Sequence, residues 1–413
     1  MSNPKSIPRA KSRERGQTLV LVALTLVSLL AMAALAIDVV TLYVAKSEAQ
    51  RAADAAALAG AKAFVDSGVT TDPTNSSLQT LAQSMATAII NAMIGQNKVA
   101  GTAPQLASAP SFDFSQAGNP RITVILQRTD LPIFFARIWG GTLANVSATA
   151  TAEAYNASNS QTLTGNLVRI APKCVKPFLT PNLDPNRGGA AYITPTTGAV
   201  AAGLVGEDPY GTTPWRNACP NGSATCDLSL SPSPGDYYPA TVTTNSANLC
   251  PSCKGPSNFE QSVECCDFNT YSCGGTAWNA SIDLTIAGNN SRQDTHQGLQ
   301  CLANLSAPDT LDARNFPVDP MKITAGSGPQ SGNLVSTSNS IVTLPIFDQT
   351  TWNDVTGEVT VIGFLQAFIW SVNGSGDIRM TILNVVGCGN NPSGGTPISG
   401  GGVTPIPVRL IHN

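Results

Sequence analysis

The first apolar run of the chain constrains the fold more than any other feature. Residues 18–37, TLVLVALTLVSLLAMAALAI, carry no charge. An α-helix rises about 1.5 Å per residue, so this run is long enough to cross a bilayer core about 30 Å thick. We therefore expect a single transmembrane helix over residues 18–37, preceded by a basic tail over residues 1–17.

The basic residues that flank the run lie on its N-terminal side. An excess of Lys and Arg on one side of a membrane helix keeps that side in the cytoplasm. This predicts a membrane protein with a cytoplasmic N-terminus and an exported body. A cleaved signal peptide is the alternative, but the run exceeds the usual apolar length of about 7–15 residues, which favours an uncleaved anchor. The charged residues of the tail are Lys5, Arg9, Lys11, Arg13, Glu14 and Arg15.

The composition of the remaining chain indicates a body rich in strands and loops. Charged residues make up only 12% of the 413 residues, beside 36 Gly and 29 Pro. This argues against a helical cytosolic enzyme. The net charge is −3 although the tail is basic, so the body is mildly acidic. No nucleic-acid partner is expected, since that would need a basic face on the body.

The cysteines predict an exported, disulfide-containing body. All ten lie between residues 174 and 388, and an even number in a Gly- and Pro-rich region indicates a disulfide framework. A zinc site or a redox dithiol at the pair CPSC, residues 250–253, stays open as an alternative. The chain has no second CxxC pair at the spacing of a zinc ribbon, which weakens the zinc interpretation. No cofactor is expected. The disulfide candidates are Cys174, Cys219, Cys226, Cys250, Cys253, Cys265, Cys266, Cys273, Cys301 and Cys388.

The helix should continue well past the membrane, because neither Gly nor Pro occurs between Ile37 and Gly60. Small and apolar positions recur there in alternating steps of three and four, which marks one helix face. Lys46, Gln50 and Asp54 form a polar row on another face. Alanine allows close approach of a neighbouring backbone, so the seam suits a partner helix or sheet, or else the core of its own domain. Its members are Leu42, Ala45, Ala49, Ala52, Ala56, Ala59 and Ala63.

The sequence after the apolar run resembles a known family. RGQ, the apolar span and then DVVTLYVAKSEAQRAADAAALAGA resemble the N-terminal module of TadG-like proteins of the tight-adherence (Flp) pilus system. The resemblance implies a place in the bacterial inner membrane, with a cytoplasmic N-terminus and a periplasmic or extracellular body. It also implies partners among pilus-assembly or pseudopilin subunits, reached through the N-terminal helix, besides the lipid bilayer. The residues that carry it are Asp38, Tyr43, Gln50, Ala52, Ala53, Asp54, Ala55, Ala56, Ala57, Leu58, Ala59 and Gly60.

Two positions bear on what the resemblance implies. Asp38 is either an ordinary residue at the membrane boundary or a charge that pairs with a neighbouring subunit. Pseudopilins of the system carry Glu at the fifth position after a cleavage-site Gly, whereas the fifth residue counted from Gly16 is Leu21. Processing as a polymerising pilin is therefore not expected. The resemblance extends through residues 121–155 and touches residues 344–369.

The patterns further along predict an α+β fold. Apolar residues at helical spacing predict a helix over residues 76–97, and alternation predicts strands over 121–129 and in the segment up to 155. This gives a small pilin-like α+β module over 38–155 and a linker over 156–166. A β-rich C-terminal domain follows over 167–413, with a cysteine-rich insertion at about 174–301. Its clearest strands are SIDLTIAG, SIVTLPIF, GEVTVIGFLQAFIW and DIRMTILNVVG, with PIPVRLI as a last strand and no long helical period from residue 170 onward.

Other chemical motifs are weak. Asp227, Ser229 and Ser231 satisfy the DxSxS metal signature of von Willebrand A domains, but no apolar strand precedes them. Only His296 and His412 occur, and no GxSxG, P-loop or GxGxxG is present. We therefore expect a non-enzymatic, membrane-anchored assembly component. A membrane-tethered periplasmic enzyme with an unrecognised site, and a surface adhesin or ligand-binding module, remain the alternatives.

Overall fold

The protein consists of two compact units that interleave along the chain. Unit 1 comprises Met1–Ala56, Ala92–Pro110 and Val124–Ala150, and unit 2 comprises Ala57–Asn91, Ser111–Thr123 and Thr151–Asn413. The computed structural model describes residues 14–115, 119–133, 135, 143–157, 170–211, 231–240, 255, 257–265, 272, 289–352, 359–389, 398 and 404–411.

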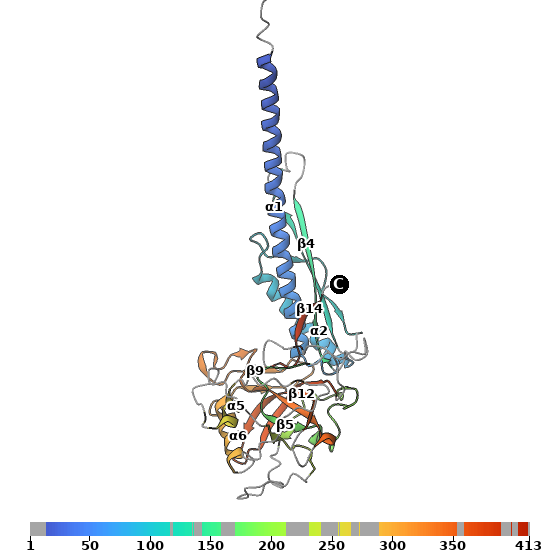
Figure 1. The fold of residues 1–413 in the computed structure, drawn as a ribbon, viewed down its shortest axis with the longest axis vertical. Helices are drawn as coiled ribbons and strands as arrows, with labels where there is room; N and C mark the ends of the chain where they lie inside the picture. Colours follow the sequence, from blue (N-terminus) through green and yellow to red (C-terminus); the bar gives the residue numbers. More distant parts are fainter. Residues whose placement is uncertain are drawn as a thin grey trace, which may run out of the picture. The chain divides into compact units, whose positions relative to one another are not determined.

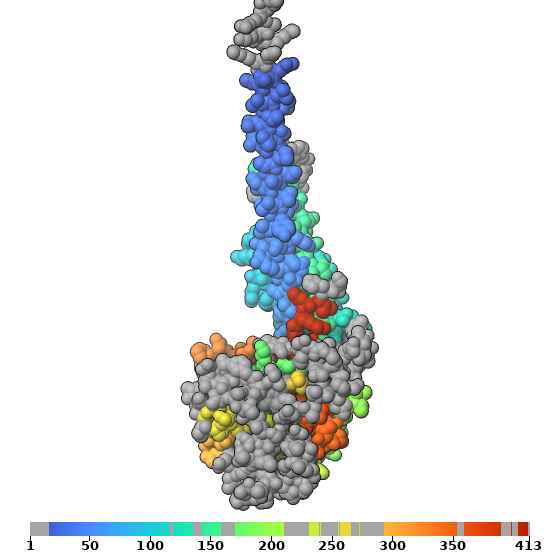
Figure 2. Space-filling model, in the orientation of Figure 1, coloured from blue at the N-terminus to red at the C-terminus, as the bar shows by residue number. Residues whose placement is uncertain are grey.

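The long helix is a single element. α1 runs from Glu14 to Asp66 without a break, so the membrane-length run and the alanine-rich segment form one rod, as the absence of Gly and Pro predicts. It is the one helix, among the described residues, that is long and apolar enough to cross a membrane, with a mean hydropathy of 2.7 over its most apolar window. In Figure 2 the first half of this helix, in blue, stands uncovered on the visible face.

The second helix also follows its pattern. α2 spans Ser76–Gln96. It begins after Asn75, whose side chain accepts hydrogen bonds from the backbone N–H groups of Ser77 and Leu78 at 3.0 and 3.3 Å. This is an N-cap, which satisfies the first unpaired donors of a helix. The buried face consists of Leu78, Leu81, Ala82, Ala86 and Ile90.

A five-stranded sheet accompanies these helices. Its order is β1–β3–β4–β14, and β2 also pairs with β3. The strand β14 comes from near the C-terminus and pairs antiparallel with β4, with Arg409 opposite Glu153. The predicted last strand therefore belongs to the sheet of the N-terminal module, and not with the C-terminal body. The bounds are β1 Gln105–Leu106, β2 Ser111–Asp113, β3 Arg121–Leu131, β4 Ala144–Ala154 and β14 Val408–Ile411.

A buried carboxylate joins three of these strands. Glu153 on β4 is 2% exposed, and Arg409 on β14 donates to it at 2.6 Å from Nε. Arg121 on β3 donates from the other side at 3.4 Å. The Arg409 guanidinium also lies over the ring of Tyr155, 4.8 Å from its centroid. The three charges stabilise the pairing of β14, which is otherwise only four residues long.

A second, larger sheet forms the core of unit 2. Its order is β6–β13–β12–β11–β5–β7, in which β5 and β11 are parallel and the other pairs antiparallel. The central strands β11 to β13 are almost wholly buried, as expected from their near-continuous apolar runs. The bounds are β5 Phe178–Pro181, β6 Tyr210–Gly211, β7 Tyr238–Pro239, β11 Ile341–Asp348, β12 Thr360–Val372 and β13 Ile378–Gly387.

The remaining described elements are two helices and a small sheet. A helix of 14 residues, α6, forms after residue 170 although the sequence there shows no long helical period. Its sequence, NNSRQDTHQGLQCL, is mostly polar, so no apolar period marks it. Helix α5 packs against α6 at Gly298, where a Cβ would come within 2.9 Å of Val263. The bounds are α5 Asn258–Glu264, α6 Asn289–Leu302, β8 Thr310–Asp312, β9 Lys322–Thr324 and β10 Leu334–Val335, and the last three pair in the order β10–β9–β8 (Figure 1).

Polar side chains connect the end of α1 to the large sheet inside unit 2. Asn384 on β13 accepts from Thr70 at 3.1 Å and donates to the carbonyl of Val65 at 3.1 Å. Asn156, just past β4, donates to the carbonyls of Thr70 and Val385. All these amides are buried. Because buried amides must be hydrogen-bonded, this network fixes how the α1–α2 turn meets β13.

Candidate functional site

The polar residues of the alanine-rich helix segment make contacts inside unit 1. Asp38 is 2% exposed, and its Oδ2 accepts a hydrogen bond from the backbone N–H of Phe135 at 3.0 Å. Phe135 lies in the connection between β3 and β4. Neither interpretation of Asp38 from sequence included this contact, because nothing in the local sequence shows which distant N–H reaches the helix.

The polar row of α1 holds the backbone of β4. Lys46 Nζ donates to the carbonyl of Ser147, and Gln50 Nε2 donates to the carbonyl of Thr149 at 3.1 Å. Gln50 also donates to Asp54 at 2.8 Å. Four residues of helix and two residues of strand span nearly the same length, about 6 and 6.6 Å. The i, i+4 row therefore matches alternate carbonyls of one strand, and β4 runs beside α1 in Figure 1.

The alanine seam is largely covered by the protein itself. Of its seven members, Ala45, Ala49, Ala52, Ala56 and Ala63 are buried, and Leu42 and Ala59 are half-buried. Small side chains let strand and helix backbones approach closely, which explains the pattern. The burial favours the interpretation in which the seam belongs to the core of its own chain.

Three other residues of the family motif, Gly60, Tyr43 and Ala53, differ in their surroundings. Gly60 is packed so closely that a Cβ would lie 2.8 Å from Ile122 Cδ1 and 3.0 Å from Ile90 Cδ1. Tyr43, in contrast, is 76% exposed. Ala53 is buried beside the seam. The motif thus combines internal contacts with one exposed aromatic ring.

An apolar surface of α1 stays exposed on the same helix. From Leu19 to Val44 the large apolar side chains of α1, apart from the half-buried Leu42, are between 48% and 76% exposed. A soluble helix would bury one such face, whereas a membrane helix exposes it to lipid. This segment has the length and composition of a membrane span.

The α1 residues that make these contacts all fall in one stretch of the chain, and a family comparison covers that stretch. Residues 16–63 match the model of a putative Flp pilus-assembly family, TadE/G-like. The predicted resemblance of the N-terminal module is confirmed for this segment. Comparisons with curated proteins and with solved structures give no match.

The TadE/G-like segment contains every residue of the motif named from sequence, from Asp38 to Gly60. Its Asp38, Lys46 and Gln50 are the residues that bind Phe135 and β4. The extension of the resemblance to residues 121–155 and 344–369 lies outside the matched segment and stays a prediction.

Much of the predicted cysteine cluster lies outside the described residues. Cys174, Cys265, Cys301 and Cys388 are described, and none of these four is a free thiol. The pairings and the complete disulfide framework stay predictions. The other six, Cys219, Cys226, Cys250, Cys253, Cys266 and Cys273, lie outside the described residues.

The remaining sequence candidates show no assembled chemistry in the part of the chain that the structure describes. Asp227, Ser229 and His412 lie outside it. His296 contacts Gln300 at 3.2 Å on α6. No group of three or more His, Cys, Asp or Glu suited to a metal ion occurs among the described residues.

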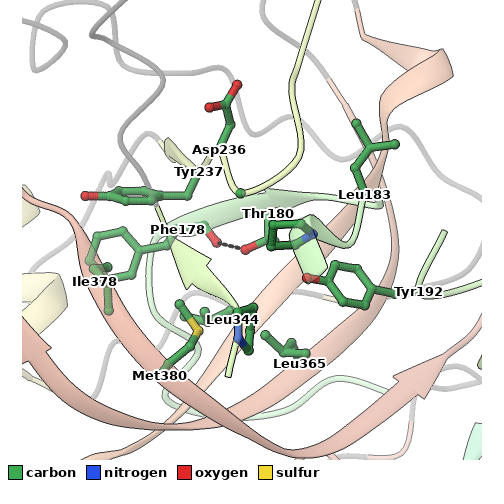
Figure 3. Close-up of a pocket in the computed structure, with 13 residues that line it drawn as sticks. Phe178, Thr180, Leu183, Tyr192, Asp236, Tyr237, Leu344, Leu365, Ile378 and Met380 are labelled. Atoms are coloured by element: carbon green, nitrogen blue, oxygen red, sulfur yellow. Dashed lines mark hydrogen bonds between the residues drawn. The ribbon is translucent and has the colours of Figure 1, made fainter. Parts of the chain in front are cut away.

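Unit 2 contains several cavities, among them a small apolar one and a larger groove. The one drawn in Figure 3 is surrounded by apolar side chains, including Leu344, Ile378 and Met380, and offers about 20 Å³ to a water-sized sphere. This is room for about one water molecule. A larger groove of about 420 Å³ lies between the end of α1 and β10, and its charged residues are Lys62, Asp66 and Lys322.

A pair of buried carboxyl groups was missed by sequence analysis. Glu260 and Glu264 lie one turn apart on α5 and are 4% and 2% exposed. Burial, with the nearby carboxylates of Glu264 and Asp294, raises the pKa of Glu260 from 4.5 to about 7. Burial also raises the pKa of Glu264, whose Oε2 accepts from the N–H of Gly255 at 2.9 Å. The i, i+4 spacing was visible in the sequence, but burial of such a polar helix was not.

Proposed function

We propose that this protein is a membrane-anchored, exported structural component of a Flp-type pilus-assembly system and is not an enzyme. The observation that carries the proposal is the match of residues 16–63 to the TadE/G-like family, on a helix whose first half has an exposed apolar surface. The long helix would anchor the protein, and the sheets would form the exported body.

The internal contacts of α1 indicate which surface is left for partners. Ala45, Ala49 and Ala52 are buried and Lys46 and Gln50 bind β4, so this face is already occupied. Partner subunits would instead meet the exposed face between Leu19 and Val44, in or near the membrane. This would confine subunit contacts to the lipid-facing surface of the helix.

The predicted disulfides are consistent with export, since disulfides form in oxidising compartments. The four described cysteines, which are not free thiols, support this part of the proposal. We propose that the N-terminus is cytoplasmic and the body periplasmic or extracellular, on the basis of the basic tail.

The test is complementation of a strain that lacks this protein. Pilus display on the cell surface should be lost and should return with the wild-type chain. A photo-crosslinking residue at Val40 should capture a pilus-assembly subunit, whereas the same residue at the exposed Val318 of unit 2 should not. Normal pili in the deletion strain would refute the proposal.

A further inference from the structure

We propose that four described residues between β3 and β4, Pro132, Ile133, Phe135 and Leu143, lie at the outer headgroup layer of the bilayer beside α1. Unit 1 would then contact lipid through two segments. The inference rests on the proposed membrane anchoring by α1. It begins from the hydrogen bond between the Asp38 carboxylate and the Phe135 N–H.

The depth of this hydrogen bond follows from helix geometry. Asp38 directly follows Ile37, the last residue of the predicted span. Side chains of a helix lean toward its N-terminus, so the carboxylate reaches back along the span. The Phe135 N–H, 3.0 Å from that carboxylate, therefore lies level with the last turn of the span.

The burial pattern of α1 agrees with this depth. Ala34 is 9% exposed, Asp38 is 2% exposed and Ala31 is half-buried, whereas all other described side chains of the helix from Gly16 to Thr41 are exposed. Residues 31 and 38 are about 10 Å apart along the helix axis. Protein therefore covers one face of α1 over the outermost 10 Å or so of the apolar run.

The exposed apolar surface of α1 continues past Asp38. Val39, Val40 and Val44 are 57%, 60% and 48% exposed. From Thr18 to Val44 the helix is about 40 Å long, close to the roughly 40–45 Å of a bilayer with its headgroup layers. Asp38, about 9 Å before Val44 along the axis, then lies near the boundary between the hydrocarbon core and the outer headgroup layer. The exposed ring of Tyr43 takes the place typical of interfacial aromatic residues.

The chemistry of the connection suits this layer. Pro132 is exposed, Leu143 is 57% exposed, and Ile133 and Phe135 are half-buried, so four apolar side chains face outward at least in part. Where water is scarce, an unpaired backbone N–H is costly. Asp38 satisfies the N–H of Phe135, and a carboxylate costs far less at the interface than at the bilayer centre.

The test uses lipid vesicles that contain the purified full-length protein and phospholipids brominated either near the headgroup or near the end of the acyl chain. Phe135→Trp places a fluorescent reporter in the connection, and its signal is the difference from wild type. Val318→Trp, at an 84% exposed position in unit 2, is the matched control. Asp38→Ala and Asp38→Asn are then combined with the reporter, because Asn keeps an acceptor for the Phe135 N–H.

We expect the Phe135→Trp signal to lose more intensity with headgroup-proximal bromine than with deep bromine, and more than the control does. Asp38→Ala should reduce that loss, and Asp38→Asn should preserve it. If alkaline carbonate does not extract the protein from the vesicles, but reporter and control are quenched equally, the inference is overturned and the proposed membrane anchoring still stands. Protein that washes off the vesicles contradicts the proposed anchoring itself.

Discussion

Arg409 on β14 donates a hydrogen bond to the buried carboxylate of Glu153 on β4, at 2.6 Å. This contact joins residues 256 positions apart in the chain. Arg121 donates to the same carboxylate from β3, so the charge of Glu153 is shared by two guanidinium groups.

Arg409→Met should destabilise unit 2 through this site. Removing one partner of a buried ion pair costs about 3–5 kcal/mol. The loss of stability here should be about 2 kcal/mol, because Arg409 is about half exposed and Arg121 still pairs with Glu153. The midpoint of urea unfolding in detergent measures it. Arg314→Met, which removes an exposed pair with Asp312, is the control and should leave the midpoint unchanged. Equal midpoints for both variants would contradict the role of Glu153.

Gly60→Ala tests the close packing inside unit 2. Alanine gains about 1 kcal/mol of helix propensity, but its Cβ would lie 2.8 Å from Ile122 Cδ1, and overpacking costs about 1–3 kcal/mol. We expect a net loss of stability. Ile122→Val removes the clashing methyl group, so Gly60→Ala should cost less in that background. A double-mutant cycle on unfolding midpoints checks this, and strictly additive effects would disprove the contact.

Gln50→Glu tests the docking of the polar row on β4. The change removes the donor to the Thr149 carbonyl. It also places a second carboxylate beside that of Asp54, which now accepts a hydrogen bond from the Gln50 amide at 2.8 Å. Leaving a hydrogen-bonding group without its partner costs about 1–3 kcal/mol. Hydrogen exchange of the β4 backbone should therefore accelerate at neutral pH. Gln50→Ala, which removes the amide without adding charge, should accelerate it less.

The carboxyl pair of α5 should make this helix sensitive to pH. The pKa of Glu260 is raised from 4.5 to about 7 in the folded protein. Between these values the folded state holds a proton that the opened state releases. Stability of α5 is therefore greatest near and below pH 4.5, falls as the pH rises through this window, and levels off above pH 7.

Hydrogen exchange of residues 257–265 between pH 4.5 and 7.5 measures this effect. The protection factor, taken relative to that of β12, should fall by up to about tenfold per pH unit. Glu260→Gln, which resembles the protonated acid, should remove the pH dependence. Asp312→Asn is the control, because the pKa of Asp312 is lowered to about 2 by Arg314 and lies outside the window. An unchanged pH profile in Glu260→Gln would assign the effect to another group.

The sequence was informative where a local pattern determines the structure. The uninterrupted run from residue 18 to Gly60 predicted one long helix, and alternation or continuous apolar runs predicted β3, β11, β12 and β13. The seam and the polar row of α1 were recognised as two faces. That β4 lies against the polar row was not recognised, because a helical period does not show which surface a helix face meets.

Contacts between distant segments were missed for a related reason. The hydrogen bond from Phe135 to Asp38 involves a backbone N–H, which carries no residue signature. The helix α6 was missed because its residues are polar and its buried positions too few to form a period. The place of β14 was missed because four residues fit either sheet, and the deciding partner, Glu153, lies far away in the chain.

The position of β14 has a consequence for biogenesis. During synthesis α1, β3 and β4 leave the ribosome early, but the edge of β4 between Thr151 and Ala154 cannot pair with β14 until Val408–Ile411 arrive. An unpaired strand edge is a template for wrong association. The N-terminal sheet therefore stays incomplete until some 250 intervening residues have been made, and a chaperone that shields β4 would act during that interval.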